Sequence, residues 1–193
     1  MALAPQIGRV ASELLSWSHG ARIAQDDVLW KPPGASGVGY HRDSAYISDQ
    51  FKPRDNNSVT IWIALDDADE STGTVEYAVG SHLWPRQVNE TATNSSFHGA
   101  EGDVSMPAWL AAQAAGIAHD AVKLRAAVVP RGGAIFHHQD ILHGSRPNPH
   151  LHRQYAPPEL NSRYLPRTDS DLTTRLRFAR EQPPRVGGAF AAC

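Results

Sequence analysis

The sequence predicts a mainly β fold, a double-sheet β-sandwich or jelly roll, in a single domain. Several short segments rich in β-branched and aromatic residues follow one another along the chain. The 15 glycines and 14 prolines provide frequent turns between these segments. Helical periodicity is confined to a few short stretches, and a length of 193 residues suits one domain.

The elements are predicted in the following order. Residues 7–17 have apolar residues at the spacing of one helix face, which indicates a helix. The clearest strand pattern is Ser-Val-Thr-Ile-Trp-Ile-Ala-Leu at residues 58–65. A short helix is expected at residues 107–115, within a polar surface segment. The other expected strands or extended segments are 21–30, 38–46, 74–79, 122–129, 134–138 and 142–145.

The segment beyond Gln154 is rich in proline and arginine, and its patterning is weak. We expect residues 155–193 to form a peripheral or partly disordered tail of the single domain 1–193. Covering the barrel and binding an anionic substrate are the alternative roles for this tail.

Composition and charge narrow the class of partner. The formal net charge of −2 provides no basic field for nucleic acid or a membrane surface. No apolar run approaches the roughly 20 residues that span a bilayer, and the N-terminal residues lack the pattern of a secretory signal. The single cysteine, Cys193, excludes an internal disulfide and is compatible with a reducing compartment. We therefore expect an intracellular protein, cytoplasmic or in another such compartment, that acts on a small molecule.

The first candidate site is His41-Arg42-Asp43, in a predicted extended segment. Residues i and i+2 of a strand project to the same face, so the imidazole and the carboxylate can converge on one point. A second histidine from elsewhere would complete the two-histidine, one-carboxylate set of non-heme Fe(II) oxygenases. The alternative for this tripeptide alone is a surface pair that recurs by chance.

Several late histidines compete for the third ligand position. His143 is favoured because it follows a strand and a turn and precedes Gly144-Ser145. His137 and His138 are adjacent, so a strand would place them on opposite faces, where one of them can support the site without binding metal. His150 and His152 lie in a proline-flanked loop and are expected to be exposed.

Arg153 follows ten residues after His143. An oxygenase of this type needs a fixed cation for the far carboxylate of 2-oxoglutarate, and the planar guanidinium binds a carboxylate through two hydrogen bonds. Ser145 can add a hydroxyl donor to the same carboxylate. The alternative for Arg153 is a solvated surface charge.

Four blocks in this order resemble the phytanoyl-CoA dioxygenase-like family of Fe(II)/2-oxoglutarate oxygenases. They are Asp27-Val-Leu-Trp-Lys-Pro-Pro-Gly34, His41-Arg-Asp43, Val59-Thr-Ile-Trp-Ile-Ala-Leu-Asp-Asp-Ala68 with Gly73-Thr-Val and Gly80-Ser-His82, and Gly132-Gly-Ala-Ile-Phe136 leading to His143-Gly-Ser145, Asn148 and Arg153. Together they run from about Ala21 to Arg153.

The resemblance implies a double-stranded β-helix with His41, Asp43 and His143 as catalytic iron ligands. It implies that Arg153 and Ser145 bind the distal carboxylate of 2-oxoglutarate. It places Trp62 at the wall of the cosubstrate pocket, where an ordinary core position is the alternative. The implied reaction is hydroxylation of a small organic molecule at a C–H bond, with O2 and 2-oxoglutarate consumed and succinate and CO2 released.

The sequence also departs from the family pattern. Only 40 residues precede His41, which is short for the family, and the interval between His143 and Arg153 is one residue shorter than expected. Arg42 stands where glutamine is frequent. The rival functions are a redox-neutral, metal-dependent enzyme on a cupin-like barrel and a non-catalytic remnant that binds metal and 2-oxoglutarate.

Overall fold

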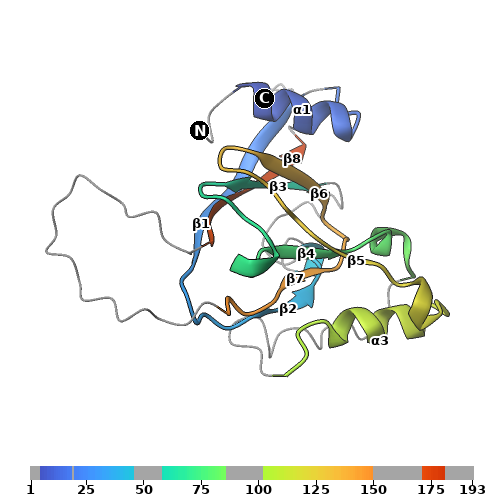
Figure 1. Ribbon diagram of the computed structural model, residues 1–193. Coiled ribbons are helices and arrows are strands. Elements are labelled where there is room, and N and C mark those ends of the chain that lie inside the picture. Colours follow the sequence, from blue (N-terminus) through green and yellow to red (C-terminus); the bar gives the residue numbers. More distant parts are fainter. Residues whose placement is uncertain (1–4, 19, 46–57, 86–101, 150–170, 181–193) are drawn as a thin grey trace, which may run out of the picture.

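The computed structural model describes residues 5–18, 20–45, 58–85, 102–149 and 171–180, the last as backbone only. Strands dominate these ranges, and the helices lie outside the sheets (Figure 1). The elements in chain order are α1 (Pro5–Leu14), β1 (Ala21–Lys31), β2 (Val38–His41), β3 (Ser58–Ala64), η1 (Glu70–Thr72), β4 (Val75–Ala78), η2 (Ser81–Leu83), α3 (Met106–Ala114), η4 (His119–Ala121), β5 (Leu124–Ala126), β6 (Ala134–His138), β7 (His143–Ser145) and β8 (Asp171–Arg180).

The described strands form two four-stranded sheets with the orders β1-β8-β3-β6 and β2-β7-β4-β5. Every pair of neighbouring strands in these sheets is antiparallel. Strands from the first and second halves of the chain therefore alternate within each sheet. This is the double-stranded β-helix, or jelly roll, that the sequence predicts. No helix among the described residues has the length and apolar character to cross a membrane.

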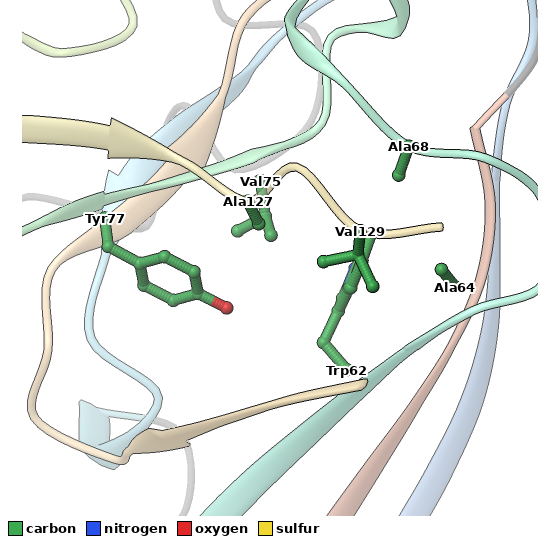
Figure 2. Packing of buried hydrophobic residues seen from close by; sticks show 7 residues of the cluster. All are labelled: Trp62, Ala64, Ala68, Val75, Tyr77, Ala127 and Val129. Atoms are coloured by element: carbon green, nitrogen blue, oxygen red, sulfur yellow. The ribbon is translucent and has the colours of Figure 1, made fainter. Parts of the chain in front are cut away.

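Strand β3 is buried on both faces, which explains its continuous apolar pattern. Val59, Ile61 and Ile63 pack on one side against Ala11 and Trp17, from α1 and the turn after it. On the other side, between the sheets, Trp62 packs in a cluster with Ala64, Ala68, Val75, Tyr77, Ala127 and Val129 (Figure 2). The amphipathic first helix thus covers the outer face of one sheet and leaves the inner face to the site.

The outer side of the second sheet is covered by α3. Ala108 of α3 is fully buried against Tyr40 and Leu142, and Ala78 belongs to the same cluster. This packing supports strands β2, β7 and β4 near their functional residues.

Strand β8 corrects one expectation from the sequence. Residues 171–180 do not belong to a peripheral tail, because β8 lies between β1 and β3 and pairs with both along most of their lengths. The remaining tail residues, 155–170 and 181–193, lie outside the described residues. The expected strand over 38–46 is also shorter than predicted, since β2 ends at His41.

Candidate metal centre

His41, Asp43 and His143 meet at one end of the second sheet. His41 is the last residue of β2 and is paired with His143, the first residue of β7. Asp43 follows in the turn after β2, so the turn, and not the alternation of a continuous strand, brings its carboxylate to the imidazoles. All three side chains are buried, with exposed fractions of 3%, 0% and 4% for His41, Asp43 and His143.

The three potential ligand atoms surround one point. Asp43 Oδ1 lies 4.0 Å from His41 Nε2 and 3.8 Å from His143 Nε2. The ligand atoms of the three residues all lie within 4.8 Å of one another. Three donor atoms at such separations can converge on one ion with small side-chain adjustments. Within the described ranges, these residues form the only group of three or more with this geometry.

The hydrogen bonds of the two imidazoles determine which nitrogen faces the ion. His41 Nδ1 lies 2.9 Å from Gly39 O, and His143 Nδ1 lies 3.0 Å from Ile141 O. A carbonyl oxygen only accepts, so Nδ1 donates its hydrogen, and a neutral ring then presents the lone pair of Nε2 to the centre. Burial, together with the neighbouring His41, lowers the pKa of His143 well below 6.5, which favours the neutral imidazole that a metal ligand requires.

The second carboxylate oxygen of Asp43 is held from the other sheet. Thr60 Oγ1 donates a hydrogen bond of 2.5 Å to Asp43 Oδ2, and His137 Nε2 lies 3.2 Å from the same oxygen. The Nδ1 atom of His137 lies 3.0 Å from the hydroxyl oxygen of Tyr77. Oδ1 is therefore the oxygen presented to an ion, and Oδ2 is bound by protein donors.

Ser145 is two residues beyond His143 on β7, and it contacts a cation that sequence reasoning did not single out. Lys31 Nζ donates to Ser145 Oγ at 2.7 Å, to Gly73 O at 2.9 Å, and to Arg146 O. The one feature of the sequence that could have pointed to Lys31 is its place in the Asp27–Gly34 block, which resembles the family. Two residues of a strand advance about 6.8 Å, so this cation and the metal centre lie at separate positions along the inner face.

The other candidate residues are packed or hydrogen-bonded within the protein, or they lie outside the residues that the structure describes. Trp62 is 4% exposed in the cluster between the sheets, as expected of a core residue, and its role at a cosubstrate pocket stays a prediction. Arg42 is buried, and its Nη1 donates to the carbonyl oxygens of Ser81 and Asp140. His138 is partly exposed, with 35% of its side chain accessible. Arg153, His150 and His152 lie outside the described residues.

A jelly roll with two histidines and an aspartate on one buried point has the ligand set that is typical of non-heme iron oxygenases. The chain belongs to the phytanoyl-CoA dioxygenase (PhyH) family, whose model matches residues 2–150. No curated protein sequence matches the chain.

Solved structures share the fold at low sequence identity. AviO1 from Streptomyces viridochromogenes Tue57 is 18% identical, with a TM-score of 0.57 over 96% of this chain and 61% of that chain. SnoN, described as a non-heme alpha-ketoglutarate-dependent epimerase from nogalamycin biosynthesis, is 20% identical, with a TM-score of 0.59 over 92% and 55%. EctD from S. alaskensis, solved with 2-oxoglutarate and 5-hydroxyectoine, is 16% identical, with a TM-score of 0.58 over 92% and 50%. The chain thus spans between half and about three fifths of the length of these proteins.

Proposed function

We propose that this chain is an Fe(II)- and 2-oxoglutarate-dependent oxygenase in which His41, Asp43 and His143 hold the iron. The observation that carries the proposal is the arrangement of the three ligand atoms. Both histidines have Nδ1 bonded to a carbonyl oxygen, and Asp43 has Oδ2 bonded to protein donors, so each residue directs one atom to the same point. A set of two imidazoles and one carboxylate suits Fe(II) and leaves coordination positions for a cosubstrate and O2.

The far carboxylate of 2-oxoglutarate is assigned to Ser145 and Lys31. Their hydroxyl and ammonium groups are 2.7 Å apart. The Ser145 hydroxyl can donate to a carboxylate, and the Lys31 ammonium, whose three hydrogens are donated to Ser145 Oγ, Gly73 O and Arg146 O, supplies a positive charge beside it. The offset of about 6.8 Å between His143 and Ser145 along β7 is comparable with the reach of an extended five-carbon diacid. Arg153, which the sequence predicts as the cation for this carboxylate, stays a prediction and would act as a second cation beside Lys31. Arg175 is a rival, because β8 pairs it with Trp62 on β3.

Iron with 2-oxoglutarate supplies oxidation of a C–H bond by O2, coupled to the release of succinate and CO2. The residues of this chain contribute placement and a dry environment. The ligands are almost fully buried, and Trp62, Tyr77 and Val129 keep water from the space between the sheets. The substrate is proposed to be a small organic molecule, and hydroxylation is the proposed outcome.

Two other functions would use the same three ligands. A redox-neutral metal enzyme has no need of a cationic group at Ser145, so the Lys31 contact favours the oxygenase. A non-catalytic remnant would bind iron and 2-oxoglutarate without turnover. Succinate formation that depends on 2-oxoglutarate separates the oxygenase from both alternatives.

The test is an anaerobic titration with Fe(II) and 2-oxoglutarate, followed by the visible charge-transfer absorption of the chelate. The wild-type protein is expected to develop this absorption, and His41→Ala and Asp43→Ala are each expected to abolish it. His82→Ala is the matched control, since His82 is an exposed residue in η2. A folded wild-type protein that binds Fe(II) but never develops the absorption would overturn the proposal.

A further inference from the structure

His137 occupies an interior position that an apolar side chain would ordinarily fill. It lies on β6 and is 6% exposed, whereas its neighbour His138 points to the partly exposed side of the strand. The His137 ring centroid lies 4.6 Å from that of His143 and 5.2 Å from that of Tyr77. A third buried imidazole beside the proposed metal ligands therefore calls for a specific role.

We propose that His137, oriented by Tyr77, is a positioning residue that holds Asp43 as a one-oxygen ligand. This inference rests on the proposed function, because it concerns the metal that Asp43 would bind. His137 contacts Oδ2 and not Oδ1, and in the described part of the chain it is outside the group of residues whose ligand atoms converge on one point. It acts through Asp43 and is not itself assigned as a ligand.

The direction of the hydrogen bonds follows from the carboxylate. An ionised carboxylate only accepts, so His137 Nε2 carries the hydrogen in the 3.2 Å contact with Asp43 Oδ2. In a neutral ring, Nδ1 then accepts a hydrogen bond from the Tyr77 hydroxyl at 3.0 Å. Burial, and then the charge of Asp43, raises the pKa of Tyr77, so the phenol keeps its proton and remains a donor.

Two donors on one oxygen have a consequence for coordination. Thr60 and His137 are opposite residues in the β3–β6 pairing, so both approach Oδ2 from the same sheet. With Oδ2 held by both, the carboxylate is restrained from turning to bind an ion through two oxygens. A one-oxygen aspartate leaves one more coordination position for cosubstrate or O2.

The test uses cobalt(II) as a probe, because its visible absorption reports coordination number without any turnover. His137→Phe keeps a flat ring and removes the donor. We expect it to weaken cobalt(II) affinity by about 10- to 100-fold and to change the position and intensity of the absorption bands. His137→Gln, which retains an N–H donor, should recover part of both signals. Tyr77→Phe should shift them in the same direction by a smaller amount.

His138→Phe, on the neighbouring position of the same strand, is the matched control and should resemble wild type. Circular dichroism shows whether each variant folds. If His137→Phe does not fold, Tyr77→Phe and His137→Gln test whether His137 positions Asp43. If the folded His137 variants have wild-type affinity and absorption, this inference is overturned while the metal centre stays intact. If His137→Phe does not fold, wild-type affinity and absorption in Tyr77→Phe overturn it in the same way. Failure of the wild-type protein itself to bind cobalt(II) or Fe(II) would instead remove the proposed function and this inference together.

Discussion

Thr60 and His137 are directly opposite each other on strands β3 and β6, and both reach the same oxygen of Asp43. The aspartate comes from the turn after β2, in the other sheet. One carboxylate therefore links the two sheets of the jelly roll at the candidate metal centre.

Thr60→Val is expected to lower the free energy of unfolding of the metal-free protein by about 1.5–3 kcal/mol, the range for a hydrogen bond to a charged group. Thr60 is fully buried, so water cannot replace the lost donor. Thr60→Ser keeps the hydroxyl and should lose only about 0.8 kcal/mol for the missing methyl group. Urea denaturation measures both values, and equal losses in the two variants would contradict the assignment.

Lys31→Gln is expected to weaken 2-oxoglutarate binding by roughly 10-fold or more, about 1.4 kcal/mol, because the positive charge beside Ser145 is lost. The affinity for Fe(II) should change little, because Lys31 contacts Ser145 and not the metal ligands. Anaerobic calorimetry measures the two affinities separately. An equal decrease in both would remove Lys31 from the cosubstrate site.

Arg153→Ala and Arg175→Ala can be compared in the same assay to identify the second cation. The variant that lowers 2-oxoglutarate affinity with unchanged Fe(II) affinity marks the arginine that contacts the far carboxylate. If Arg175 has this effect and Arg153 does not, the prediction from the His143–Arg153 spacing is wrong.

The stability of the metal-free protein should depend on the protonation of His143. Its pKa is well below 6.5 in the folded protein, while the unfolded chain takes up the proton near 6.5. The unfolded state therefore binds more protons as pH falls below 6.5, and the stability that His143 contributes above this pH is lost. Between about pH 7.5 and about pH 5.5 the free energy of unfolding should fall less steeply in His143→Gln than in wild type. Parallel pH profiles would contradict the expectation.

Gly144 lies between the proposed metal ligand His143 and Ser145, where β7 passes close to β2. A methyl group at Gly144 would lie 2.5 Å from Tyr40 Cδ2 and 2.7 Å from Val38 O. We expect Gly144→Ala to cost about 1–3 kcal/mol through overpacking and to displace His143, with weaker metal binding. Gly8→Ala in α1 is the control, because its added carbon has no close contact and should raise stability by about 0.5–1 kcal/mol. Thermal unfolding and metal titration measure both variants.

The sequence predicted the fold and the His41–Asp43 pair because each leaves a local signal, whereas His143 was selected by its place after a strand and a turn and by the family resemblance. Strand β3 has a continuous apolar run, and His41 and Asp43 are only two positions apart. The role of Lys31, and the choice of His137 over the adjacent His138 as the supporting imidazole, follow only from tertiary contacts with Ser145 and Asp43, which are far away in the sequence. No local pattern encodes such contacts.

Strand β8 was missed although it carries an alternating pattern, with Leu172, Leu176 and Phe178 at even positions and arginines at 175 and 177. When the partner strand is unknown, a segment with arginines at alternate positions has the pattern of a solvent-exposed segment. The pairing places Leu176 opposite Ile61 and Phe178 opposite Val59, so the register puts the even positions of β8 on the face of the sheet that carries Val59 and Ile61. The pairing with β3 thus explains the alternation of apolar residues and arginines, which the high arginine content of this segment had made hard to recognise as a strand.

The position of β8 also bears on how the molecule is made. Among the described strands, β1 has β8 as its only neighbour, and the pairing of Ala21 with Arg180 joins residues that are 159 positions apart (180 − 21). During synthesis β1 must wait until β8, at least 140 residues later (Lys31 pairs with Asp171, and 171 − 31 = 140), has left the ribosome before it can complete its backbone hydrogen bonds. Slow, late closure of this sheet is expected, and a gene product that stops at residue 150 would leave β1 and one edge of β3 exposed to pairing with other chains.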